Sequence, residues 1–178
     1  MTGVARVVAR AAVFVVGAST LVACAPMEEH AGAPLVPPME PFPMVSDALE
    51  YRCATLDCHG KPERNLRLYG SSGLRLAPDG ATGSGTTTDA EYAANYDSVV
   101  GLEPEILSRV VEEGGWLPDR LTLVRKGRGT EYHKGNAVLV PGDDADRCLT
   151  SWLASAVDEA ACERAKEMVR PGGETEEP

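Results

Sequence analysis

The chain has 178 residues and a formal net charge of −10, with 17 basic against 27 acidic side chains. An acidic balance of this size argues against the nucleic-acid-binding class, which needs a basic face to meet the phosphates. Aromatic residues make up 5% of the chain, so we expect a small, mainly aliphatic core in a single domain.

The first 23 residues have the layout of a secretory signal peptide. Arg6 and Arg10 precede a short apolar run that ends in small residues. This run is shorter than the roughly 20 apolar residues that a membrane-spanning helix requires. The four residues Leu21-Val22-Ala23-Cys24 resemble the bacterial lipobox, in which the cysteine is acylated and becomes the new N-terminus. The alternative is an ordinary secretory peptide with Cys24 as a stray thiol.

The lipobox resemblance implies an exported protein with its lipid on Cys24. Ala25 follows this cysteine where aspartate would favour retention at the inner membrane, so the resemblance implies anchoring in the outer membrane, facing the periplasm or the surface. Removal of two arginines with the signal peptide lowers the net charge from −10 to −12. The membrane is therefore an expected partner through the lipid and not through charge.

The mature chain divides into a tether, one domain and a tail. Residues 24–45 contain six prolines, a density that favours extended polyproline II structure, so we expect a disordered tether there. Residues 46–169 form the expected domain. Residues 170–178 contain two glycines and three glutamates and form an expected disordered tail.

We expect a mainly α domain with a few short extended segments. The sequence predicts helices that begin near Ser46, Thr88, Pro104, Asp143 or Asp144, and Asp158. Residues 66–68 and 74–76 read as extended, and residues 116–141 as irregular with short apolar pieces. Trp116 and Trp152 are both predicted to lie in the core.

The most informative motif is Cys53-Ala-Thr-Leu-Asp-Cys58-His59. Two cysteines just before a histidine resemble the c-type haem attachment sequence, in which both thiols bind haem covalently and the histidine binds the iron. The common spacing has two residues between the cysteines; here there are four, a spacing that also occurs among multihaem cytochromes.

A second resemblance covers roughly residues 50–155. The chain is similar to the short cytochrome-c-like modules of the planctomycete-type cytochrome C family. The matching stretches are Leu66-Arg-Leu68, Gly73-Leu-Arg-Leu76, Arg120-Leu-Thr-Leu-Val-Arg-Lys126, His133-Lys-Gly135, Asp143-Asp144-Ala-Asp146 and Leu149-x-x-Trp152-Leu153.

These resemblances imply a cytochrome-c-like electron-transfer domain with haem c as its cofactor. Cys53 and Cys58 would bind haem covalently, and His59 would be the proximal ligand of the iron. For the sixth ligand we prefer His133, in a glycine-rich loop, over Met168 near the C-terminus. A redox protein is then a candidate partner.

Other interpretations of the same residues stay open. Cys53 and Cys58 could form a disulfide in a haem-free envelope lipoprotein with a binding or structural role. Together with His59 and His133 they could also provide four zinc ligands. With Cys24 assigned to the lipid, Cys148 and Cys162 remain as a pair, and we expect a disulfide between them that joins the last two helices.

The sequence contains no hydrolase motif. Its serines lack a nucleophile-elbow context, and neither His59 nor His133 has an acidic partner within a motif. The glycine-rich stretch near Gly83 and Gly85 lacks the preceding buried strand of a phosphate-binding loop. We therefore expect a protein that is not an enzyme.

Overall fold

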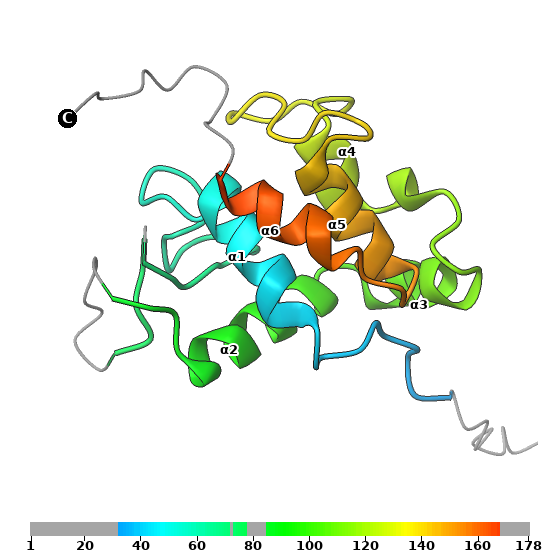
Figure 1. Ribbon diagram of the computed structural model, residues 1–178, viewed down its shortest axis with the longest axis horizontal. Helices are drawn as coiled ribbons and strands as arrows, with labels where there is room; N and C mark the ends of the chain where they lie inside the picture. The colour runs from blue at the N-terminus through cyan, green and yellow to red at the C-terminus, as the bar shows by residue number, and fades with distance from the viewer. Residues whose placement is uncertain (1–31, 72, 78–84, 168–178) are drawn as a thin grey trace, which may run out of the picture. The chain divides into compact units, whose positions relative to one another are not determined.

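The computed structural model describes residues 32–71, 73–77 and 85–167 (Figure 1). The predicted signal peptide, Cys24, the first part of the tether, Met168 and the tail lie outside these residues. The helices are α1 (Phe42–Cys53), α2 (Asp89–Val100), α3 (Pro104–Glu112), the 3-10 helix η1 (Pro118–Arg120), α4 (Thr122–Gly127), α5 (Asp144–Leu153) and α6 (Glu159–Glu167). No helix within the described ranges has the length and apolar character needed to cross a bilayer.

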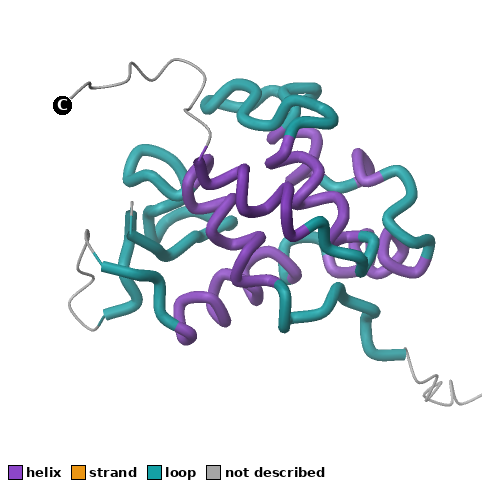
Figure 2. Tube along the Cα trace, in the orientation of Figure 1, coloured by secondary structure: helices purple, strands orange, loops and turns teal. Residues whose placement is uncertain are grey.

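Helices joined by long loops make up the domain, and the described residues contain no strand (Figure 2). The mainly α fold class is thus confirmed. Of the expected extended segments, one isolated bridge between Tyr69 and Leu74 is present. The predicted irregular stretch 116–141 was partly wrong, because η1 and α4 lie within it.

Helices α1, α5 and α6 lie against one another at the centre of Figure 1. Their inward faces carry much of the buried apolar core: Phe42, Val45, Leu49, Cys148, Leu149, Trp152, Leu153, Cys162 and Ala165. Cys148 and Cys162 form the expected disulfide, which joins α5 to α6. The two cysteines are 14 residues apart. A disulfide that closes a loop of this length lowers the entropy of the unfolded chain, and this stabilises the fold by roughly 3 kcal/mol.

Three of the five predicted helix starts carry a side-chain cap, and one of them is Asp158 before α6, which accepts from the Ala161 amide at 2.9 Å. Thr88 and Glu91 form a capping box at the start of α2, and the Asp143 side chain accepts a hydrogen bond from the Asp146 amide at the start of α5. Pro104 opens α3, where its missing N–H costs no hydrogen bond. These starts were predictable because each depends on side chains within one helical turn.

The segment before α1 corrects the predicted boundary of the domain. The tether was expected to reach residue 45, yet α1 begins at Phe42, whose side chain is fully buried. The Tyr96 hydroxyl donates to the Pro37 carbonyl at 2.8 Å, and the Trp152 indole donates to the Pro38 carbonyl at 2.9 Å. A high proline content indicates an extended backbone. Such a segment can still pack against the domain, because its carbonyl groups can accept hydrogen bonds from domain side chains.

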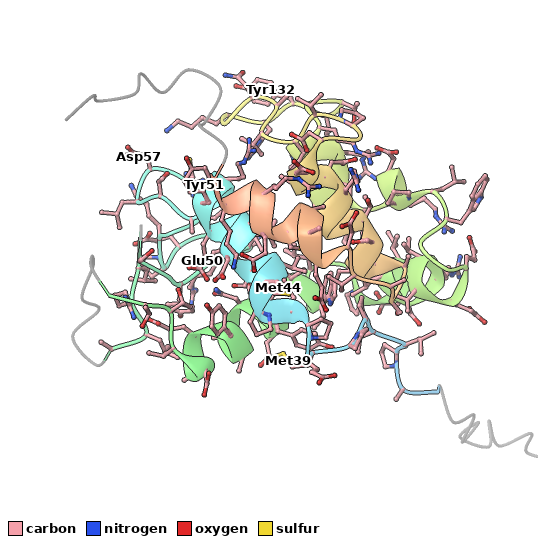
Figure 3. All side chains as sticks on the ribbon, in the orientation of Figure 1. Met39, Met44, Glu50, Tyr51, Asp57 and Tyr132 are labelled. Atoms are coloured by element: carbon pink, nitrogen blue, oxygen red, sulfur yellow. A yellow bond between two sulfur atoms is a disulfide. The ribbon has the colours of Figure 1, made fainter. Side chains whose placement is uncertain are left out.

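A buried polar cluster ties α1 to α2 and to the segment that follows the cysteine motif. Glu50 accepts hydrogen bonds from Ser46 at 2.9 Å and from Thr87 at 2.7 Å (Figure 3). The Asn95 amide donates to Ser46 and to the Tyr69 carbonyl, and it accepts from the Tyr69 amide at 2.7 Å. Burial raises the pKa of Glu50 to about 7, although the hydrogen bonds from Thr87 and Ser46 oppose this rise.

Glu50 therefore makes folding stability depend on pH. Because its folded pKa lies above the unfolded value, its contribution is fully present below about pH 4.5 and is lost as pH rises through about 7. Between pH 5 and pH 8 we expect the free energy of unfolding of the wild type to fall by about 2–3 kcal/mol through this group. The E50Q variant should not show this fall. Urea denaturation at both pH values measures the difference. E112Q, at an exposed glutamate of α3, should follow wild type; an E50Q that also follows wild type would contradict the assignment.

Candidate functional site

Two loops that are distant in sequence bring the histidines of the domain together. His59 follows α1, and His133 lies between α4 and α5. Their ring centroids are 5.9 Å apart, with the ring planes inclined by 21°. Figure 3 labels one residue in each loop. These are Asp57, which precedes Cys58 in the sequence, and Tyr132, which precedes His133. Both the haem resemblance and the zinc alternative grouped His59 with His133, and the fold brings their rings close together.

The cysteine motif is held in a compact turn at the C-terminal end of α1. The His59 amide donates to the Cys53 carbonyl at 2.9 Å, and the Cys58 amide donates to the Thr55 carbonyl at 2.8 Å. The Leu68 amide in turn donates to the His59 carbonyl at 2.9 Å. Because both sides of the turn are hydrogen-bonded, Cys53, Cys58 and His59 have a defined backbone position.

Position 60 requires a glycine, because its backbone lies very close to the backbone of Ala54 within this turn. A Cβ on Gly60 would lie 2.1 Å from the carbonyl oxygen of Ala54, and one on Gly73 would lie 2.0 Å from the same atom. Backbone has to move to relieve such contacts, so we expect Gly60→Ala to destabilise the fold by about 1–3 kcal/mol. Thermal unfolding measures the loss. Gly32→Ala is the control, because a Cβ there meets nothing within 4 Å; equal stability of the two variants would contradict the prediction.

The His59 imidazole is oriented by its backbone contact. Its Nδ1 lies 2.8 Å from the Leu66 carbonyl oxygen, an acceptor that fixes the proton on Nδ1 and leaves Nε2 as the nitrogen with a lone pair. Burial lowers the pKa of His59; the hydrogen bond to Leu66 opposes this, and His133 adds to it. A neutral imidazole with Nδ1 bound to a carbonyl has the usual arrangement of a metal-binding histidine.

His133 sits in a tight turn of the opposite loop. Its Nδ1 lies 3.3 Å from the Asn136 carbonyl oxygen, which again leaves Nε2 available. Asn136 has a left-handed backbone with φ of 56°, a conformation that asparagine adopts more readily than most residues. A Cβ on Gly135 would lie 3.0 Å from the His133 ring, so glycine leaves room for the imidazole.

Two adjoining cavities lie at this site, and they have several lining residues in common. The larger has a volume of about 520 Å³ and an apolar lining that includes Leu66, Leu102, Leu123 and Val138. The smaller has a volume of about 370 Å³. Cys53, His59 and His133 line both cavities, and Cys58 lines the smaller one. Their volumes fall within the range of small-molecule and cofactor sites.

Two of the arrangements raised by the sequence are not formed among the described residues. Cys53 and Cys58 are not joined in a disulfide, although their spacing permits one. Within the described ranges no three histidine, cysteine, aspartate or glutamate side chains come together to hold a metal ion, so the four-ligand zinc site is not formed. The predicted core position of Trp116 was wrong, because this residue is 65% exposed.

Sequence reasoning missed two contributions to the site. The Leu66 carbonyl orients His59, but a backbone acceptor leaves no signal in the residue type. Arg52 immediately precedes Cys53, lines the smaller cavity and is only 6% exposed. The sequence did show that Arg52 precedes Cys53 on the same predicted helix. It could not show that the charged side chain of Arg52 is buried, because burial depends on the tertiary fold.

No protein-family model, curated protein or solved structure matches the chain.

Proposed function

We propose that this protein is a lipid-anchored, exported, cytochrome-c-like electron carrier. In this proposal Cys53 and Cys58 would hold haem c covalently, and His59 and His133 would bind its iron. Bound haem would supply one-electron transfer, since its iron alternates between two oxidation states. The observation that carries the proposal is the meeting of His59, His133 and Cys53 around cavities of cofactor size.

The histidine geometry supports iron binding by this pair. Both imidazoles have Nδ1 next to a backbone carbonyl, which leaves Nε2 of each ring as the ligand atom. The burial that lowers the pKa of His59 keeps its ring in the neutral form that a metal requires. The larger cavity beside the rings has the apolar wall that a porphyrin would need.

The state of Cys53 and Cys58 is compatible with covalent attachment. Each thiol would add across a vinyl C=C bond, with the sulfur bonding to one carbon and the thiol hydrogen going to the other. This addition needs no external oxidant or reductant. It does require that the two sulfurs are not already joined, and the absence of a Cys53–Cys58 disulfide meets that requirement.

The test is to produce the full chain together with a cytochrome c maturation system and record its absorption spectrum. We expect a Soret band that stays with the protein after acid-acetone extraction. The double variant C53A/C58A should lose covalent haem. His133→Ala should keep it but change the spectrum, because the iron loses one axial ligand. Tyr132→Ala is the matched control, since this neighbouring side chain is 91% exposed.

A folded wild-type protein without a Soret band would overturn the haem assignment. It would leave the second interpretation, a haem-free envelope lipoprotein. That interpretation was expected to have two disulfides, and the structure contains the Cys148–Cys162 bond but none between Cys53 and Cys58.

The lipid anchor is tested separately. Metabolic labelling with a palmitate analogue should label the wild-type chain in the membrane fraction, and Cys24→Ala should abolish the label. Cys58→Ala is the control for a general effect of removing a thiol, and it should be labelled like wild type. An unlabelled wild-type protein would contradict lipidation at Cys24.

A further inference from the structure

Arg52 is a buried cation with few partners. It lies in the last turn of α1, and its side chain is 6% exposed. Its Nη1 donates to the Val138 carbonyl at 3.4 Å, a long hydrogen bond. Its Nε and Nη2 are buried and have no hydrogen-bond partner among the described residues. A guanidinium carries five N–H donors, so most of its capacity is unused.

Arg52 lines the smaller cavity, and none of the other residues that line it is acidic. The cavity wall therefore supplies no carboxylate to this guanidinium. Removing a charged group from water costs several kcal/mol unless an opposite charge and good hydrogen bonds replace the water. Several other arginines of the domain do have such partners; Arg128, for example, contacts both oxygens of Asp146 at 2.7 and 2.9 Å.

We propose that Arg52 turns its buried guanidinium toward the smaller cavity when a ligand fills it, and binds a carboxylate of that ligand. The planar fork of a guanidinium matches a carboxylate through two parallel hydrogen bonds, and Nε and Nη2 are two adjacent donors of that fork. This inference rests on the proposed function, under which the carboxylate is a propionate of haem. Arg52 then has two opposing effects: it destabilises the empty site and strengthens binding of the acidic ligand.

The test uses the full chain in detergent, produced without a maturation system so that the site stays empty. The protein is titrated with haem and with haem dimethyl ester, in which both carboxylates are blocked. Wild type should bind haem at least about tenfold more tightly than the ester, a ratio typical of one charge-assisted hydrogen-bonded contact. In Arg52→Leu the ratio should fall to near one. Arg109→Leu, an exposed site on α3, controls for the change in net charge.

The thermal stability of the empty protein gives an independent readout. Arg52→Leu should unfold at a higher temperature than wild type, because a buried charge without a counter-charge is replaced by an apolar side chain. A lower unfolding temperature would overturn the inference, since Arg52 would then have a carboxylate partner within the chain. Equal affinity of wild type for haem and ester would overturn it too, while leaving the proposed function intact. Binding of neither compound, together with no Soret band in the matured protein, would reject the proposed function itself.

Discussion

Replacing Trp152 with alanine is expected to destabilise the protein by about 3–5 kcal/mol, the usual cost of removing a large aromatic side chain from a core. Trp152 is fully buried on α5, with its ring centroid 4.9 Å from that of Phe42 and 6.2 Å from that of Tyr96. Its indole also donates to the Pro38 carbonyl. The variant loses a core contact and the attachment of the segment before α1, so stability should fall by a large part of its total.

Urea denaturation followed by circular dichroism measures this effect without depending on tryptophan fluorescence. Trp116→Ala is the matched control, because the same side chain is removed where it is mostly exposed, and it should change stability by less than about 0.5 kcal/mol. Similar losses for the two variants would show that Trp152 does not hold the core together.

Replacing Glu91 with glutamine is expected to cost about 3 kcal/mol, the lower end for breaking a buried ion pair. Both oxygens of Glu91 accept from Arg75 at 2.8 Å, and the amides of Leu76 and Thr88 each donate at 2.9 Å. A glutamine has one acceptor oxygen and no charge, so it removes the charge of Glu91 from the mostly buried guanidinium of Arg75. Glutamine can still accept from the Thr88 amide in the capping box of α2, so the expected loss comes from the ion pair and the contact with Leu76.

Glu91 adds a pH dependence on the acidic side. Burial opposes ionisation, but the contacts with Arg75, Thr88 and Leu76 outweigh it and lower the pKa of Glu91 to about 2. Its contribution is therefore present above about pH 4.5 and is lost as pH falls towards 2, and E91Q should lack this loss. Chemical denaturation at pH 3 and pH 6 measures it. Glu113→Gln breaks an exposed ion pair with Arg120 and should change stability by at most about 1 kcal/mol; an E91Q no less stable than this control would contradict the prediction.

Much of the fold was predictable because the signals are local. The capping box of Thr88 and Glu91, the cap at Asp143 and the opening proline Pro104 each act within one helical turn. The disulfide of Cys148 and Cys162 was predictable for a related reason, since two successive helices place nearby cysteines within reach. The boundary at residue 45 was wrong because proline content describes backbone conformation and does not show whether the segment docks.

For the site, the sequence by itself determined the chemical groups: two thiols and an imidazole in one short segment, followed by a second imidazole in a distant loop. Only the tertiary structure decided that His133 meets His59 and that Trp152 is buried while Trp116 is exposed. It also decided that two buried nitrogens of Arg52 have no hydrogen-bond partner among the described residues. The physical reason is that spacing along a chain fixes which groups share a turn or a helix face. Which loops meet, and which charges lose their water, depends on the packing of α1, α5 and α6 against one another, and local spacing does not contain that information.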